Sequence, residues 1–538
     1  MNENFSLLYP EGKEPSFMTL GDEACNDLSL EYICETISES EYEKNIIKRM
    51  MMKIESDPEV IRYRCDVFED VLKYPSLRNK IKELLEQLDY LKDLEKSVKD
   101  NTAEPVWQLI NRLQELDVYV NCITGINESL TENPIKSVGL KKMKDFVNSV
   151  YNESGFEHLN EDIKEMMHDL GQIRSISLGV NLDSRMRPVE VGIVSLNDEK
   201  FSRPGVLNKF LDFASKKSEI HNGASFDGMT KIHTVGKAAG EDPLMNNLSR
   251  VVTEMLGSTV KQLKNKLSRY VNVSGYSLTK LIPEFIFYIR WAEFCGKIME
   301  LGVPMAKPEI LETERREMTA KGIYNLKLAM QILSGKELDI IRNDFDFKME
   351  NGIYIMTGPN RGGKTTFTQA VGILFLMAQH GLYVPAESVE LSPCDNIYTH
   401  FPADENQTVN LGRLGEESKR LSEIFSVATN KSILLFNESL ATTSFAEGLY
   451  IAKDVVRALR YLGARTIFNT HMHELAMELD TMNSLEGDMK VASLITGIHE
   501  GKRSYKVFLA PPEGVSYAKD IAEKYGVTFN QLKKSIDE

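Results

Sequence analysis

The sequence predicts a multidomain protein whose first half is mainly α-helical with a small β-containing insertion, and whose last two-fifths form an α/β domain. Three observations support this fold class. Apolar residues recur at i, i+3, i+4 and i+7 through much of the first third, as on one face of a helix. Residues 173–182 and 189–196 alternate like strands. An apolar strand, a glycine-rich turn and a helix follow one another over residues 352–370.

The helical periodicity is clearest over residues 41–54 and 77–98, where Lys and Glu separate the apolar positions. Asp57 and Pro58 interrupt the chain between these segments, because Asp is a good N-cap and Pro is favoured at the first helical position. The same periodicity continues over residues 140–151. These segments predict a bundle of long helices.

The strand-like segments 173–182 (IRSISLGVNL) and 189–196 (VEVGIVSL) are joined by the turn-like sequence DSRMRP. This pattern predicts a β-hairpin inserted between long helices. A glycine-containing segment, residues 220–243, is expected to be a mobile loop. Helices are expected to resume over residues 244–301, and the prolines that follow mark a boundary before the α/β domain.

The glycine-rich turn carries the spacing GxxxxGK[ST], from Gly358 to Thr365. Glycines there let the backbone curl so that its N–H groups point inward around phosphates. Lys364 would reach the β- and γ-phosphates of ATP, and the Thr365 hydroxyl would face Mg²⁺. The alternative is a glycine turn without a ligand. The predicted cofactor-binding set is Gly358, Pro359, Asn360, Arg361, Gly362, Gly363, Lys364, Thr365 and Thr366.

Two further strands end in polar residues suited to this chemistry. SILLFNE, residues 432–438, is an apolar run that ends in Asn437 and Glu438. Glu438 would position or activate water, whereas Asn437 would contact Mg²⁺ only through water and brings no charge, so slow hydrolysis is expected. The second strand, ARTIFNTH, ends in His471, which would sense the γ-phosphate. The alternative for Glu438 is an ordinary carboxylate at a strand end.

The composition limits the partners and the compartment. With 64 Lys and Arg against 79 Asp and Glu, the net charge of −15 argues against a chain coated for non-specific nucleic-acid binding, although local basic patches remain possible. The six cysteines are scattered without a CxxC pair, which suits a reduced, cytoplasmic environment. No apolar stretch is long enough to cross a membrane, and the N-terminus does not have the pattern of a secretory signal.

Two basic segments are candidates for nucleic-acid binding. No acidic residue occurs between Glu254 and Glu284, and the basic candidates there are Lys261, Lys264, Lys266 and Arg269. The second segment is the hairpin turn with Arg185 and Arg187, followed by a flank containing Lys200, Arg203, Lys209, Lys216 and Lys217. Such side chains neutralise phosphates irrespective of sequence. The alternative in both cases is a solvated surface.

Four motifs, in order along the chain, resemble the ATPase domain of the MutS family. They are TGPNRGGKTT (357–366), GLYVPAE (381–387), NESLATTSFAEG (437–448) and FNTHMHEL (468–475). Upstream, SDPEVIRYRCDVFEDVLKYPSLR (56–78) is similar to the start of the helical core of that family.

The resemblance implies a helical core and lever arm with a small clamp insertion, followed by an ABC-type P-loop ATPase domain. The implied domains are 1–170 (first part of the core), 171–243 (lever and clamp), 244–317 (returning core helices) and 318–538 (ATPase domain). It also implies an ATP-dependent DNA-binding clamp, acting in DNA repair or on structured nucleic acid, that forms a homodimer through its ATPase domains. Ile340 lies where this family often has an aromatic residue stacked on the base.

The sequence also departs from the family pattern. Asn437 replaces the usual Asp, and GRLGEES (412–418) keeps only the Gly-Arg of the loop that reaches the γ-phosphate of the partner subunit. This segment either acts in trans or simply begins a helix. The N-terminal mismatch-recognition domain is not expected, which would make this a short member of the family. The ligand stays open between duplex DNA, branched DNA and RNA. The alternative function is a nucleotide-gated scaffold with weak ATPase activity that binds a protein or ribosomal partner.

Overall fold

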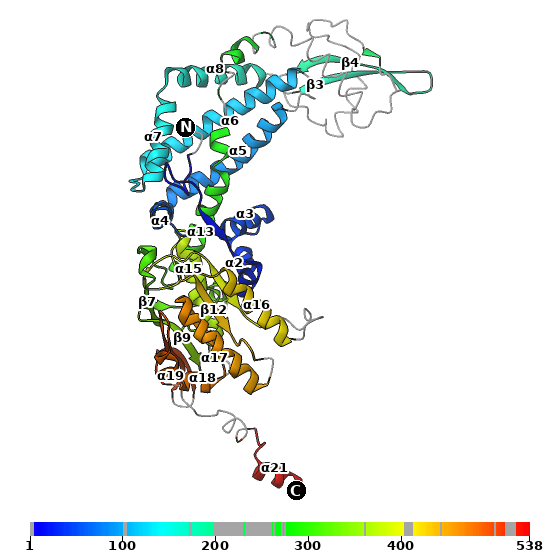
Figure 1. Cartoon of the computed structure of the whole chain (residues 1–538). Coiled ribbons are helices and arrows are strands. Elements are labelled where there is room, and N and C mark those ends of the chain that lie inside the picture. Colours follow the sequence, from blue (N-terminus) through cyan, green and yellow to red (C-terminus); the bar gives the residue numbers. More distant parts are fainter. Residues whose placement is uncertain are drawn as a thin grey trace. The chain divides into compact units, whose positions relative to one another are not determined.

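The computed structural model describes residues 5–99, 105–171, 175–197, 230–231, 261, 264–270, 273, 276–359, 362–402, 413–441, 444–499, 502–511, 523 and 525–537. The chain divides into two compact units (Figure 1). Unit 1 is formed mainly by Asn79–Pro134 and Lys142–Ile282. Unit 2 is formed by Asn2–Arg78, Ile135–Lys141 and Pro283–Glu538.

Unit 1 combines long helices with a β-hairpin. Its helices are the greater part of α5 (Pro75–Lys99), α6 (Pro105–Glu132), most of α7 (Val138–Tyr151), α8 (Ser154–Gly171) and the short α12 (Tyr276–Thr279). Apolar residues at helical spacing, such as Leu84 and Leu88 on α5 and Leu116 and Ile123 on α6, are buried. The helices predicted over residues 77–98 and 140–151 and the predicted hairpin are therefore confirmed. Most of the predicted loop (220–243) and residues 244–260 of the predicted returning helices lie outside the described residues. The hairpin strands are β3 (Ser175–Leu182) and β4 (Pro188–Asn197), which pair antiparallel, with β5 (Thr230–Lys231) beside β4.

Unit 2 is built around a six-stranded sheet in the order β11-β12-β13-β9-β14-β15. All neighbours pair in parallel except β14 and β15. The strands are β9 (Asn351–Thr357), β11 (Ile397–His400), β12 (Ile433–Asn437), β13 (Arg465–Asn469), β14 (Lys490–His499) and β15 (Lys502–Leu509). The associated helices are α15 (Lys364–Gln379), α16 (Arg413–Val427), α17 (Phe445–Leu462), α18 (His473–Met477) and α19 (Leu479–Ser484).

Smaller elements complete unit 2. A four-stranded sheet has the order β6 (Glu309–Ile310), β10 (Ser388–Leu391), β7 (Met318–Ile323) and β8 (Asn343–Phe347). A two-stranded sheet pairs β1 (Phe17–Thr19) with β2 (Lys53–Glu55). The remaining helices are α1 (Asp22–Asp27), α2 (Leu30–Ile37), α3 (Glu41–Met51), α4 (Pro58–Lys73), α13 (Ile282–Glu300), α14 (Leu326–Leu333) and α21 (Phe529–Asp537).

Helix α15 lies at the centre of unit 2 and is buried on nearly all sides. It contacts β12 and β13, whose apolar residues are also buried, as expected for strands of a covered parallel sheet. A Cβ atom at Gly372 would come within 2.6 Å of Leu28 and 2.7 Å of Leu435. The helix is therefore packed between β12 and the N-terminal segment.

The N-terminal segment is placed differently from the sequence-based boundaries, which grouped residues 1–170 together. Asn2–Arg78 belong to the same unit as the six-stranded sheet. The Gln379 side chain donates to the Glu55 carbonyl (2.6 Å), and the Thr399 hydroxyl donates to Asp27 (2.6 Å). These contacts join residues more than 300 positions apart, so local periodicity carries no sign of them.

Local sequence signals predicted the start of α4 correctly but placed the end of α3 too far along the chain. Asp57 caps α4 by accepting from the Glu59 N–H (2.8 Å), as predicted. The helix expected over residues 41–54 ends earlier, at Met51, because the chain turns into strand β2. All six cysteines are buried and unpaired. Within the described ranges, no helix has the length and apolar character needed to cross a membrane.

Candidate nucleotide-binding site

The glycine turn lies between β9 and α15, at the carboxyl edge of the parallel sheet. Gly358 has φ of 142°, and a Cβ atom there would lie 2.1 Å from the Thr496 hydroxyl oxygen. Gly363, with φ of 92°, precedes the first turn of α15. Both positions therefore require glycine. Asn360 and Arg361, which were predicted to bind phosphate, lie outside the described residues.

Lys364 begins α15 and is only 4% exposed. Its ammonium group donates to the carbonyls of Gly358 (3.0 Å) and Pro359 (3.2 Å). Desolvation lowers the pKa of Lys364, while the Glu438 carboxylate acts in the opposite direction. Within the described part of the turn, the hydrogen-bond acceptors of this buried ammonium are neutral carbonyls, so anionic phosphate oxygens would be better partners.

The turn after β12 presents Glu438. This residue adopts φ of 52° and Leu440 adopts 65°, conformations that cost on the order of 1–3 kcal/mol each and cluster at functional sites. The Glu438 carboxylate lies 2.9 Å from Nε2 of His471, at the end of the neighbouring strand β13. This hydrogen bond lowers the pKa of Glu438. The carboxylate is therefore ionised at neutral pH and is suited to orienting water.

A polar cluster beside the turn joins α15, β12 and β13. The Thr365 hydroxyl donates to Oδ1 of Asn437 (2.8 Å), and the Asn469 amide donates to the same oxygen. Asn437 and Asn469 are paired in register on neighbouring parallel strands, and both are buried. Asn469 was not singled out from the sequence, although an amide at the end of the next strand was a visible signal. The cluster contains no charged group.

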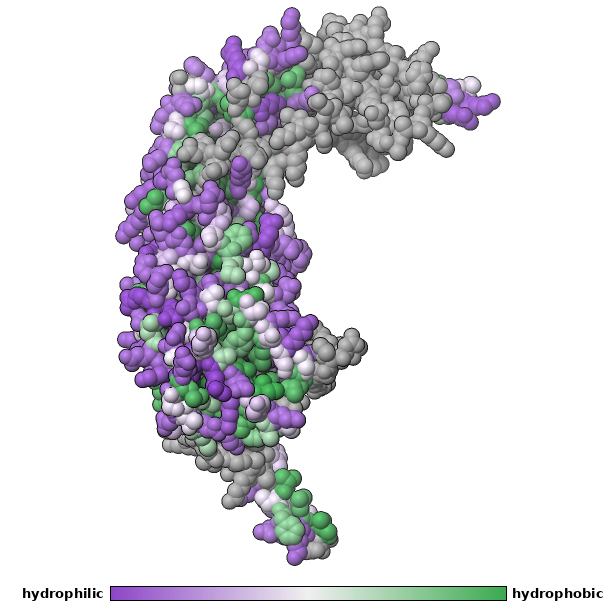
Figure 2. All heavy atoms as spheres, viewed as in Figure 1, coloured by the Kyte–Doolittle hydropathy of each residue, from purple (hydrophilic) through white to green (hydrophobic). Residues whose placement is uncertain are grey.

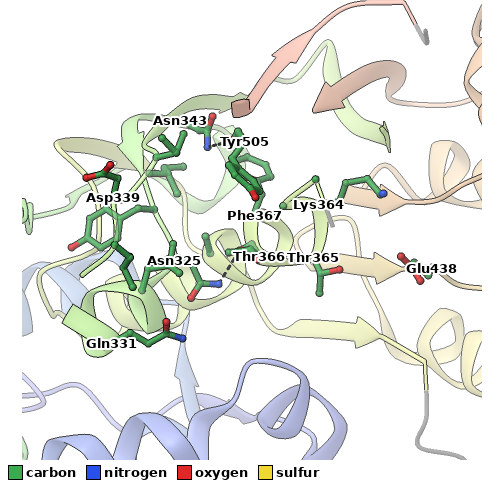
Figure 3. Close-up of a pocket in the computed structure, with 18 residues that line it drawn as sticks. Asn325, Gln331, Asp339, Asn343, Lys364, Thr365, Thr366, Phe367, Glu438 and Tyr505 are labelled. Carbon is green, nitrogen blue, oxygen red and sulfur yellow. Dashed lines mark hydrogen bonds between the residues drawn. The ribbon is translucent and has the colours of Figure 1, made fainter. Parts of the chain in front are cut away.

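Lys364, Thr365 and Glu438 line one end of a cavity of about 530 Å³, a size within the range of ligand pockets. Figure 3 shows Lys364, Thr365 and Glu438 toward one end, and Gln331 and Asp339 toward the other. The remaining wall combines apolar and amide side chains from α14, β8 and the segment between them. The end of the cavity with Lys364 suits the phosphates of a nucleotide, and the partly apolar wall suits its base and sugar.

At the end of the cavity away from Glu438, the lining residues are not the ones that the sequence led us to expect. Leu338 and Ile341 line the cavity, whereas Ile340 is not among the lining residues. Ile340 and Ile341 are adjacent residues just before β8, so the expected base contact lies next to a residue that lines the cavity. The role of Ile340 at the base stays a prediction.

Tyr505, on β15, is an aromatic wall residue that the sequence did not reveal. A Cβ atom at Gly363 would lie 3.2 Å from its ring, and Figure 3 shows the ring next to Phe367. Tyr505 adopts φ of 54°, and its carbonyl accepts from the Asn343 amide (3.3 Å). No local pattern connects this strand with the glycine turn, because more than 100 residues separate them.

The described part of the segment GRLGEES, residues 413–418, lies in α16 (Arg413–Val427). Glu417 accepts from the Leu440 N–H (2.7 Å) and so supports the strained turn that carries Glu438. Gly412 lies outside the described residues. A role of this segment in a partner subunit stays a prediction.

The basic candidates have different surroundings. Lys266 forms an ion pair with Glu165 (2.6 Å), and Arg269 lies 3.8 Å from Asp162. Both acids are on α8, so the absence of acids in the local sequence is offset by another helix, which sequence spacing did not show. Lys261 and Lys264 are exposed. Arg185 and Arg187 are exposed at the hairpin turn, and the basic flank from Lys200 to Lys217 lies outside the described residues.

Comparisons with known proteins match the helical part and the α/β part of the chain separately. A family model described as MutS domain V matches residues 354–525, and one described as MutS2 N-terminal domain matches residues 56–301. An Endonuclease MutS2 from Staphylococcus epidermidis is 27% identical over 289 residues, which are 52% of this chain and 36% of the relative. A DNA mismatch repair protein MutS from Chlorobium chlorochromatii is 36% identical over 148 residues, 27% of this chain and 17% of the relative.

An Endonuclease MutS2 from Thermus thermophilus is 29% identical over 197 residues, 37% of this chain and 26% of the relative. The matched part of each of these relatives is thus little more than a third of its length or less. The fold and the site define a multidomain protein that joins a helical unit to an α/β unit. The chain belongs to the MutS family.

Proposed function

We propose that this protein binds ATP with Mg²⁺, hydrolyses it slowly, and uses ATP to close two subunits around duplex or branched DNA. The observation that carries the proposal is the cavity in which Lys364, Thr365 and Glu438 converge at one end. Relatives named for DNA mismatch repair support DNA as the ligand. Calorimetric titration with Mg-ATP should show saturable binding, and the absence of binding would remove the basis of the proposal.

In this proposal, Lys364 and the backbone N–H groups of the glycine turn hold the phosphates. Oxygen atoms are the ligands that Mg²⁺ prefers, and the Thr365 hydroxyl at the cavity wall lies 2.8 Å from the buried Asn437 Oδ1, so the donor set fits the ion. Mg²⁺ would neutralise phosphate charge there. Glu438, oriented by His471, would hold the attacking water. Closure of two α/β units would exclude bulk water.

Asn437→Asp should lower the Mg²⁺ concentration needed for half-maximal ATPase activity and should raise turnover. An Asp at this position can accept the same hydrogen bonds from Thr365 and Asn469 and adds one negative charge beside the metal. The measurement is ATPase activity against Mg²⁺ at fixed ATP. Gln331→Glu is a matched control, because it adds the same charge toward the other end of the cavity. An unchanged Mg²⁺ requirement in Asn437→Asp would show that Asn437 is not near the metal.

Tyr505→Ala should weaken ATP binding by roughly fivefold or more, because aromatic stacking on a base contributes about 1–3 kcal/mol. Tyr505→Phe should retain most of the affinity. Inorganic tripolyphosphate, which has no base, should bind Tyr505→Ala and the unmodified protein equally. Tyr461→Ala, at an exposed position on α17, is the control. Equal loss of ATP and tripolyphosphate affinity would contradict a base-facing role for Tyr505.

The alternative function is a nucleotide-gated scaffold that binds ATP, scarcely hydrolyses it, and grips a protein, an RNA or a ribosomal partner. The neutral cluster of Thr365, Asn437 and Asn469 supports slow hydrolysis and hence this alternative. The names of the relatives support DNA instead. Brisk turnover by the unmodified protein would count against the scaffold.

A further inference from the structure

The turn of the β3–β4 hairpin is a closed, internally bonded structure. The Asp183 N–H donates to the Arg187 carbonyl (2.9 Å), and the Met186 N–H donates to the Asp183 carbonyl (2.9 Å). The Asp183 carboxylate accepts from the N–H groups of Arg185 (2.8 Å) and Arg187 (2.9 Å). With its backbone groups satisfied in this way, the turn presents its side chains in a fixed arrangement.

Three of those side chains, on Arg185, Met186 and Arg187, suggest that the turn binds a ligand. Met186 is 76% exposed and adopts φ of 60°, a conformation that L-residues with side chains rarely adopt. Arg185 and Arg187 are exposed on either side of it, and neither forms an ion pair with another described residue. Figure 2 shows hydrophilic atoms at the free end of the hairpin. Met186 is thus an exposed apolar residue flanked in the sequence by two exposed arginines.

Among the other basic candidates in unit 1, Lys261 and Lys264 are exposed, whereas Lys266 and Arg269 are less available. Lys266 is paired with Glu165, and Arg269 lies near Asp162, so part of their charge is already balanced. Asp183 is the acid nearest in sequence to the two turn arginines, and its carboxylate is bound to backbone N–H groups. The arginine side chains therefore remain free to contact phosphate.

We propose that this turn enters the minor groove of duplex DNA, with Met186 as a wedge between base steps and Arg185 and Arg187 on the groove and its phosphates. The proposal rests on the proposed function, since it specifies how the clamp would hold its duplex. Proteins that bind the minor groove combine arginine with an apolar wedge such as Met, and the wedge partly unstacks a base step.

The first experiment measures which groove is occupied. The full chain is titrated onto a fluorescent AT-rich duplex, and the complex is challenged with netropsin, which fills the minor groove, or with methyl green, which fills the major groove. Netropsin should displace the protein and methyl green should not. Displacement by methyl green alone would overturn the proposal, because a two-stranded ribbon can also enter the major groove.

The second experiment separates the wedge from the cations. Met186→Ala should reduce the fluorescence increase of a duplex containing 2-aminopurine, which reports unstacking, by at least half. Arg185→Ala combined with Arg187→Ala should weaken binding tenfold or more. The slope of log affinity against log salt should fall by about 2, at roughly 0.9 per phosphate contact. Met349→Ala and Arg49→Ala, at exposed positions in unit 2, are the matched controls.

The outcomes distinguish this proposal from the proposed function. No binding of the unmodified protein to any duplex would overturn both. Binding by the unmodified protein that is unchanged in the tip variants and unaffected by netropsin would overturn the minor-groove contact alone. Reduced affinity in the arginine variant, together with an unchanged 2-aminopurine signal in Met186→Ala, would overturn the wedge.

Discussion

Glu438→Gln should lower ATP turnover by about 100-fold or more and leave ATP affinity nearly unchanged. The amide keeps the size of the side chain but cannot act as a base, a role that contributes roughly 10²–10⁴ in rate. Glu438 lies at the end of the cavity near Lys364 and is held by His471 (2.9 Å), whose hydrogen bond lowers the pKa of the carboxylate. Single-turnover ATPase assays measure the effect on the chemical step.

The same variant should accumulate as a dimer in the presence of ATP, because the closed state is released only by hydrolysis. Sedimentation velocity at micromolar protein, with ATP and then with ADP, measures this. Glu474→Gln is the matched control, since Glu474 is an exposed carboxylate on α18, close to His471 in sequence. A monomer at all concentrations with ATP would argue against a site shared between two subunits. Undiminished turnover would remove Glu438 from the mechanism.

Lys364→Ala should weaken ATP binding or turnover tenfold or more, a loss of about 1.4 kcal/mol or above. The ammonium group is buried and is held near the carbonyls of Gly358 and Pro359, where phosphate would lie. The loss should be seen with tripolyphosphate as well as ATP, because Lys364 acts on the phosphates. Calorimetric titration measures the affinity.

Lys327→Ala provides the control for loss of a buried lysine. Lys327, on α14, is also partly buried and donates to the Ser29 hydroxyl (3.0 Å), but it does not line the cavity. Its substitution should leave nucleotide affinity within twofold of the unmodified protein. If Lys364→Ala binds and turns over ATP as well as the unmodified protein does, the assignment of the glycine turn is wrong.

Local sequence patterns predicted the elements that depend on neighbouring residues. The periodicity of α5 and α7, the alternation of β3 and β4, the Asp57 cap and the strand–turn–helix around Gly358 all reflect interactions within a few residues. Two apolar runs that end in polar residues also predicted the strands that carry Asn437, Glu438 and His471. The structure brings Thr365 to Asn437 and Glu438 to His471.

Features that depend on contacts between distant segments were not predicted. The N-terminal segment joins unit 2 through contacts such as Gln379 with Glu55, and Tyr505 reaches the cavity from a strand far along the chain. The acids of α8 offset Lys266 and Arg269, which seemed unbalanced in the linear sequence.

The affinity of Glu438→Gln for nucleic acid, measured by filter binding with and without Mg-ATP over a series of salt concentrations, tests the central claim most directly. Duplex DNA, branched DNA and structured RNA are compared under the same conditions. The account predicts that ATP raises the affinity for duplex or branched DNA at least tenfold, and that log affinity falls linearly with log salt, as phosphate contacts require. Affinities for all three ligands that are weak and identical with and without ATP would contradict an ATP-dependent DNA clamp.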